Sequence, residues 1–168
     1  MSKNLGQKLI IISGSPCVGK TTVADSLLNL CGNSAHLDDD WVWRVNPFLF
    51  DDPRNPNIMK NMSFVLSGYL NLNYDYVIVS SVRLLDQSNR DFVLENITAK
   101  DYSVISFMLT CTEKTLTERH RNRGDNNELS FKWLRLDPLP DDFVIETDNK
   151  TVPEIAKEIK DIIDKYTK

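Results

Sequence analysis

The sequence predicts an α/β fold with a five-stranded parallel sheet between two layers of helices. Short apolar runs alternate with segments of helical periodicity along the whole chain. The runs are continuous rather than alternating in polarity, as is typical of strands buried on both faces of a parallel sheet. Repetition of the strand–helix order, with right-handed crossovers, then places helices on both faces.

The expected strands are five short runs rich in β-branched and aromatic residues. They are residues 8–13, 34–37, 76–80, 102–109 and 143–146. Residues 8–13 end at a glycine turn and residues 76–80 (YVIVS) form the clearest buried strand, whereas residues 34–37 carry the weakest pattern.

The expected helices follow these strands and carry apolar stripes at helical spacing. They are residues 21–30, 38–45, 57–72, 87–97, 113–121 and 152–166. The stripes are Val23, Leu27 and Leu30; Ile58, Met62, Val65, Leu66 and Tyr69; Phe92, Val93 and Ile97; and Ile155, Ile159, Ile162 and Ile163. Residues 47–56 hold three of the seven prolines and are expected to form a loop.

Length and composition favour one domain over residues 1–168. Hydrophobic residues make up 41% and charged residues 26%, and the net charge of −4 disfavours a nucleic-acid partner. Three cysteines without C-x-x-C spacing argue against a disulfide framework or a zinc site. With no apolar stretch long enough for a signal peptide or a membrane span, we expect a cytoplasmic protein.

One motif carries a specific chemical prediction. Residues 14–21 (GSPCVGKT) match G-x-x-x-x-G-K-[ST] between an expected strand and an expected helix. In such a P-loop the main-chain N–H groups and the helix N-terminus bind phosphates. Lys20 would reach the β- and γ-phosphates of ATP, and the Thr21 hydroxyl would bind Mg²⁺. The expected nucleotide-binding residues are Gly14, Ser15, Pro16, Cys17, Val18, Gly19, Lys20, Thr21 and Thr22.

Two further patterns narrow the class of P-loop protein. A GTPase would need N-K-x-D, but Asn149-Lys150 is followed by Thr151-Val152. The run at 76–80 ends in Ser80 and Ser81, where a hydrolase would carry a Walker B acid. Both observations disfavour a dedicated hydrolase and leave Mg²⁺ in need of another carboxylate.

The chain resembles the small P-loop kinases, the nucleoside monophosphate kinase-like group that includes shikimate kinase, gluconate kinase and chloramphenicol phosphotransferase. The resemblance rests on the P-loop and covers nearly the whole chain in element order. It implies the P-loop NTPase fold, ATP and Mg²⁺ as cofactors, and transfer of the γ-phosphoryl group to a small-molecule acceptor.

An acidic triplet follows the second expected strand, in Leu37-Asp38-Asp39-Asp40-Trp41. The resemblance to the family's h-D-x-D pattern implies Asp38 beside the metal and Asp40 beside the acceptor hydroxyl as base or orienting group. Asp39 takes the latter role if the register slips by one. A solvated acidic N-cap is the alternative interpretation.

Arginines complete the expected site. Arg119 and Arg123 match the family's R-x-x-x-R lid, expected at about residues 119–130, although a basic helix end that complements the helix dipole is the alternative. The resemblance also implies that the loop Ser80-Ser81-Val82-Arg83 contacts the acceptor, so that Arg83 would bind an anionic acceptor; a surface arginine is the equal alternative. Arg44 stands one place beyond the position at which some relatives carry an arginine, which weakens its assignment to the acceptor.

The acceptor region is expected at about residues 41–72. It contains Trp41, Trp43, Phe48 and Phe50, which favour packing over stacking on a substrate.

These patterns together predict an ATP-dependent phosphotransferase acting on a small-molecule hydroxyl or phosphate, as a monomer or homodimer. Three alternatives stay open at this point: a nucleoside monophosphate kinase, a non-catalytic nucleotide-binding regulatory protein, and a nucleic-acid 5′-hydroxyl kinase.

Overall fold

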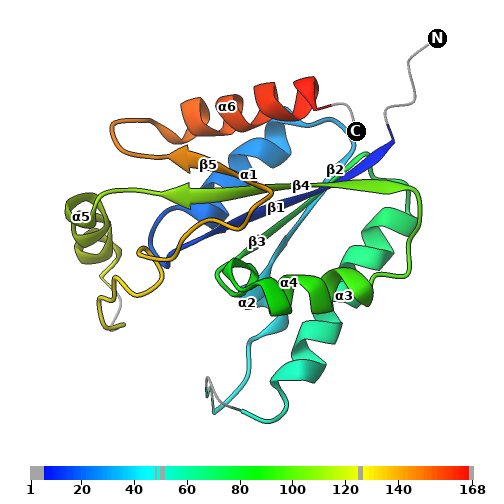
Figure 1. Ribbon diagram of the computed structural model, residues 1–168, viewed down its shortest axis with the longest axis horizontal. Helices are drawn as coiled ribbons and strands as arrows, with labels where there is room; N and C mark the ends of the chain where they lie inside the picture. Colours follow the sequence, from blue (N-terminus) through cyan, green and yellow to red (C-terminus); the bar gives the residue numbers. More distant parts are fainter. Residues whose placement is uncertain (1–5, 48, 50–51, 125–126, 167–168) are drawn as a thin grey trace.

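The computed structural model describes residues 6–47, 49, 52–124 and 127–166. Its centre is a parallel sheet whose strand order is β2-β3-β1-β4-β5 (Figure 1). The strands are β1 (Gln7–Gly14), β2 (Ser34–Asp38), β3 (Tyr76–Ser81), β4 (Tyr102–Thr110) and β5 (Asp142–Glu146). The predicted five-stranded parallel sheet is therefore confirmed.

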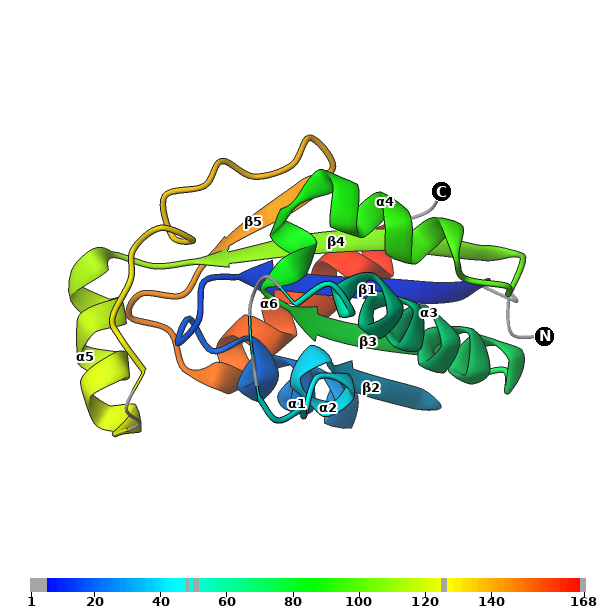
Figure 2. The same cartoon turned by 90° about the horizontal axis from the view of Figure 1, so that it is seen from below.

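Helices cover both faces of this sheet, so the molecule has three layers (Figures 1 and 2). Helices α1 (Lys20–Leu30) and α6 (Val152–Lys165) lie on one face, and α3 (Asn55–Asn71) and α4 (Gln87–Glu95) lie on the other. The short helices α2 (Asp39–Val42) and η1 (Arg83–Leu85, a 3-10 helix) follow β2 and β3 at their carboxyl ends. Helix α5 (Glu113–Arg123) follows β4 at the same edge.

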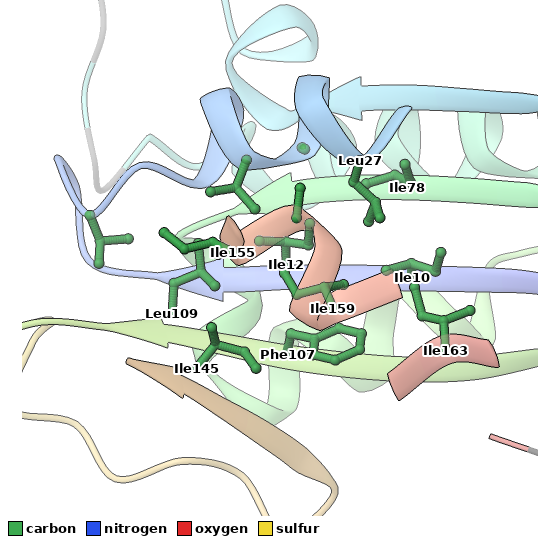
Figure 3. Packing of buried hydrophobic residues seen from close by; sticks show 14 of the residues in the cluster. Ile10, Ile12, Leu27, Ile78, Phe107, Leu109, Ile145, Ile155, Ile159 and Ile163 are labelled. Carbon is green, nitrogen blue, oxygen red and sulfur yellow. The ribbon is translucent and has the colours of Figure 1, made fainter. Parts of the chain in front are cut away.

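The α1/α6 cluster is the apolar layer on one face of the sheet (Figure 3). Alternate residues of β1, Ile10 and Ile12, meet Ile155 and Ile159 of α6 there, and all four are at most 3% exposed. Burying one such side chain stabilises the fold by roughly 1.5–3 kcal/mol.

The α3/α4 cluster occupies the opposite face. Leu9 and Ile11, the other residues of β1, pack there with Met62 and Leu66 of α3. Because successive strand residues point to opposite faces, the continuous run of β1 supplies both clusters.

Local signals explain where several helices begin and end. Glu154 accepts a hydrogen bond from the Thr151 main-chain N–H, which satisfies a free donor at the start of α6. The Thr112 side chain accepts from Thr115 N at the start of α5. Helix α5 ends at Gly124, whose φ of 65° is a left-handed conformation that favours glycine.

Two expected apolar stripes are partly wrong. Leu30 is 49% exposed rather than buried. In α3 the buried face is rotated, so that Met59, Ser63 and Leu70 are buried whereas Ile58 is only half-buried. The physical reason is that the Ser63 hydroxyl donates to the Val93 carbonyl at 3.0 Å, which makes burial of a polar side chain favourable.

None of the helices in the described part of the chain is long and apolar enough to cross a membrane.

Candidate active site

The P-loop joins β1 to α1 at the centre of the sheet and holds its backbone in conformations that require glycine. Gly14 has a φ of 147°, and a Cβ there would lie 2.6 Å from the Leu109 carbonyl oxygen. Gly19 has a φ of 104° just before α1. These turns place the N-terminus of α1, with its unpaired N–H groups, at the carboxyl edge of the sheet.

Ser15 is the first residue after Gly14 in the loop. Its hydroxyl is buried and has no hydrogen-bond partner among the described residues. A buried hydroxyl without a partner in such a loop is suited to donate a hydrogen bond to a phosphate oxygen.

Lys20 lies inside the loop, with its Nζ 3.0 Å from the Ser15 carbonyl oxygen. Burial lowers the Lys20 pKa, whereas the carboxylates of Asp39, Asp38 and Asp40 act to raise it. The three carboxylates therefore lie close enough to Lys20 to favour its charged form.

Asp38 is the most heavily bonded carboxylate of the acidic triplet. Its Oδ2 accepts hydrogen bonds from the hydroxyls of Thr21 at 2.6 Å and Ser80 at 2.7 Å. Its Oδ1 accepts from Asp40 N at 3.0 Å, so Asp38 is both the N-cap of α2 and a partner of the P-loop threonine.

Oxygen ligands are concentrated around this point. Carboxylate oxygens of Asp38, Asp39 and Asp40 all lie within 4.8 Å of one another, with the Thr21 hydroxyl beside Asp38. Because Mg²⁺ prefers oxygen ligands and few protein carboxylates, Thr21 and Asp38 fit the metal expected from the sequence.

Asp39 and Asp40 differ sharply in environment. Asp39 is 7% exposed, accepts from the Ser81 hydroxyl at 2.6 Å, and has a pKa raised to about 6, mainly by burial. Asp40 is exposed and lines the cleft, and among the described residues no hydrogen bond to its carboxylate is present. The sequence pattern alone did not show that Asp39 is buried and Asp40 exposed.

Arg83 lines the same cleft as the triplet. Its guanidinium lies 3.3 Å from the centre of the Trp43 ring, and burial lowers the Arg83 pKa. The Ser81 hydroxyl accepts a hydrogen bond from Arg83 N, which fixes the start of η1. Trp43 is buried, as expected for a packing residue, whereas Trp41 is 57% exposed. Phe48 and Phe50 lie outside the described residues.

Helix α5 brings Arg119 and Arg123 to the P-loop. Arg119 donates to the Val18 carbonyl at 2.8 Å and to the hydroxyl and carbonyl of Thr147 at 2.9 and 3.1 Å. Arg123 lies against the loop, with Nη1 3.8 Å from the Cys17 sulfur. Helix α5 runs two residues beyond the expected end at 121, so both arginines belong to one helix.

These groups line one cleft of about 860 Å³ at the carboxyl edge of the sheet. It includes most of the P-loop, the acidic triplet, Arg83, Arg119 and Arg123. Residues 127–130 of the expected lid also line it, whereas 125–126 lie outside the described residues. Arg44 is exposed and is not among the described residues that line the cleft.

A comparison with known protein families gives a match over most of the chain. A sequence profile described as "AAA domain" matches residues 10–133, from β1 to beyond α5. The chain belongs to the AAA domain family. A comparison with curated proteins found no match.

Solved structures of other proteins share the fold of this AAA domain. A gluconokinase from Sinorhizobium meliloti 1021 is 17% identical, with 98% of this chain and 100% of that chain covered and a TM-score of 0.66. A Mycobacterium tuberculosis APS kinase in complex with AMPPNP and APS is 16% identical, with 95% and 98% covered and a TM-score of 0.67. A shikimate kinase from Acinetobacter baumannii in complex with shikimate is 20% identical, with 96% of each chain covered and a TM-score of 0.63. All three are small P-loop kinases, which confirms the predicted fold of this AAA domain.

Several contacts at the site were not predicted from the sequence. His120 and Trp133 line the cleft, and Thr147 holds Arg119. Ser80 and Ser81 were not predicted to be partners of the triplet, yet the Ser80 hydroxyl donates to Asp38 and the Ser81 hydroxyl donates to Asp39. The available signal for these contacts was that one expected strand ends in two serines and another ends in the acidic triplet.

Proposed function

We propose that this protein is an ATP-dependent phosphotransferase that moves the γ-phosphoryl group to a small molecule. One observation carries the proposal: P-loop residues, the Asp38–Asp40 triplet and Arg83 line a single cleft. A phosphate donor and an acceptor bound there would be neighbours, which is what in-line transfer requires.

The nucleotide half uses the P-loop. Main-chain N–H groups and the N-terminus of α1 bind the phosphates, and Lys20 neutralises charge on the transferred group. Arg123 closes from α5 onto the phosphates, whereas Arg119 fixes the position of α5 against Val18 and Thr147. Thr21 and Asp38 would hold Mg²⁺, which when bound neutralises charge on the β- and γ-phosphates.

The acceptor half uses the triplet and residues 41–72. Asp40 is the exposed carboxylate in the cleft and orients or deprotonates the acceptor hydroxyl. Asp39 is the alternative for this role, since it also lines the cleft. Arg83 contacts the acceptor, and α5 with residues 127–130 covers the nucleotide as the lid.

We infer further that residues 1–168 act as one domain in the cytoplasm. Cys17, Cys31 and Cys111 are free thiols, which supports a reducing compartment.

Transfer from ATP labelled at its γ-phosphate to a panel of sugars, polyols, hydroxy acids and nucleoside monophosphates tests the proposal. Lys20→Ala should abolish transfer together with most triphosphate affinity. Asp40→Asn should lower transfer to a hydroxyl by at least about 10²-fold, and transfer to a phosphate much less, because a phosphate acceptor needs no base.

The same variants separate the remaining possibilities. A wild-type protein that binds ATP but labels nothing in the panel, and whose ATP affinity is the same in Asp40→Asn, would be a nucleotide-binding regulatory protein. Labelling of 5′-hydroxyl oligonucleotides that falls with salt would indicate a nucleic-acid kinase. Unchanged triphosphate affinity in Lys20→Ala would overturn the proposal.

A further inference from the structure

A chain of hydrogen bonds runs from the protein surface to the Asp38 carboxylate. His36 Nδ1 lies 3.0 Å from Asp25 Oδ1, and His36 Nε2 lies 2.9 Å from Ser80 Oγ. Ser80 in turn donates to Asp38 Oδ2, the oxygen that also accepts from Thr21. The chain crosses from α1 through β2 to β3 and back to the end of β2.

The directions of these bonds follow from donor counting. Ser80 has one hydroxyl hydrogen, and the Asp38 carboxylate can only accept, so that hydrogen points at Asp38. Ser80 Oγ then presents a lone pair to His36, which makes Nε2 a donor. The Asp25 carboxylate lies against Nδ1, so the imidazole is held at both of its nitrogens.

Burial makes the arrangement stiff. His36 is 6% exposed, Ser80 1% and Asp38 5%, while Asp25 at the outer end has a side chain that is 57% exposed. The Trp41 ring packs 5.4 Å from the imidazole. A buried hydrogen-bond chain of this kind fixes rotamers because breaking any one bond leaves a polar group unsatisfied.

We propose that His36 is a positioning residue: acting through Ser80, it fixes the Asp38 carboxylate so that Thr21 presents its oxygen to Mg²⁺. This inference rests on the proposed function, in which Thr21 and Asp38 hold the metal. With Asp38 Oδ2 held in place, the Thr21 hydroxyl hydrogen is committed to Asp38, and the lone pairs of the Thr21 oxygen would be available to Mg²⁺. His36 touches neither substrate nor metal, so its contribution is geometric.

The test measures AMPPNP affinity by calorimetry, once with Mg²⁺ and once with EDTA. For each variant it reports the affinity with Mg²⁺ divided by the affinity with EDTA, called the ratio below. The ratio cancels any loss of folded protein, because both titrations sample the same folded population. Thermal unfolding of each variant is measured alongside.

Ser80→Ala removes the donor to Asp38, and we expect its ratio to fall about tenfold, as for loss of one hydrogen bond to a charged group. His36→Leu should lower the ratio about threefold or more, and His36→Gln, which can donate from a similar position, should restore most of it. The matched control is Ser67→Ala. Ser67 is another buried serine, in α3 and away from the cleft, and its hydroxyl donates to the Ser63 carbonyl and accepts from Thr98 N. It should lower the melting temperature and leave the ratio unchanged.

The outcomes are distinguishable. If the wild-type ratio is above one and both His36→Leu and Ser80→Ala have the same ratio, the positioning role is overturned and the proposed function stands. A wild-type ratio of one would remove the metal assignment and this inference with it. A ratio that falls equally in Ser67→Ala would show a general effect of core disruption and would likewise overturn the inference.

Discussion

Replacing Asp39 with asparagine should make the protein more stable at neutral and alkaline pH. Burial, the largest cause, together with the charges of Asp40 and Asp38, raises the pKa of Asp39 to about 6, against 3.8 for an ordinary aspartate. The Ser81 hydrogen bond and Lys20 oppose that rise but do not cancel it. Folding therefore disfavours the ionised form of this carboxylate.

The sign and the size follow from linkage. A carboxyl whose pKa is higher in the folded state costs stability once it ionises, and the cost disappears as pH falls below the unfolded value. With a rise of about two units, the cost is about 3 kcal/mol at about pH 8 and about 1.6 kcal/mol at about pH 5. Asparagine carries no charge and removes this cost.

The decisive quantity is the change in the stability difference between the two pH values. The packing of the new amide against Ser81 adds the same amount at both, so the advantage of Asp39→Asn should grow by about 1.4 kcal/mol from about pH 5 to about pH 8. Urea unfolding in EDTA measures it.

Two further variants sharpen the comparison. Ser81→Ala removes the hydrogen bond that lowers the Asp39 pKa, so stability should depend more steeply on pH in that background. Asp40→Asn removes a charge but leaves Asp39 buried, so most of the pH dependence should stay. An advantage of Asp39→Asn that is constant, or that shrinks as pH rises, would refute the reasoning.

Other substitutions test the remaining features. Gly14→Ala places a Cβ 2.6 Å from the Leu109 carbonyl oxygen at a φ of 147°, so we expect loss of about 2 kcal/mol or more and of nucleotide binding, measured by urea unfolding and calorimetry. Arg90→Leu leaves the fully buried Asp142 carboxylate, now 2.7 Å from Arg90 Nη1, without its partner; a cost of about 3–5 kcal/mol is expected, and an unchanged unfolding midpoint would contradict it. Ile159→Ala empties part of the α1/α6 cluster and should cost about 2–5 kcal/mol in the same assay. Arg119→Lys cannot reproduce the fork that holds Val18 and Thr147, and ATP affinity should fall about tenfold; equal affinity would show that these bonds do not position the nucleotide site.

Sequence reasoning recovered the fold because its signals are local. The runs in β1, β3 and β4 are long and continuous, and the P-loop motif fixes the junction between β1 and α1 by itself. The rotated face of α3 could not be read in this way, because Ser63 and Ser67 are buried by bonds to residues about thirty positions away. A periodicity of apolar residues contains no information about such partners.

The candidate site divides along the same line. The P-loop residues, Asp38 at the end of its strand and Arg119 on its helix follow from spacing within short segments, whereas Arg123 lies beyond the helix end expected at residue 121. The burial of Asp39 and the stacking of Arg83 on Trp43 depend on how β2 and β3 lie side by side. Whether an aspartate in a run of three is buried or exposed is decided by the neighbouring strand, whose Ser81 hydroxyl donates to Asp39.

The two apolar clusters separated by the sheet bear on how such a protein can diverge. Residues of α3 and Trp43 rest on the α3/α4 cluster, whereas Val18 and α1 rest on the α1/α6 cluster. A mutation that reshapes one side is thus insulated from the other by a layer of hydrogen-bonded backbone. If the protein acts as proposed, its preference for an acceptor can change through α3 and Trp43 while the P-loop side stays the same, which makes the α3 side of the sheet the target for engineering new specificity.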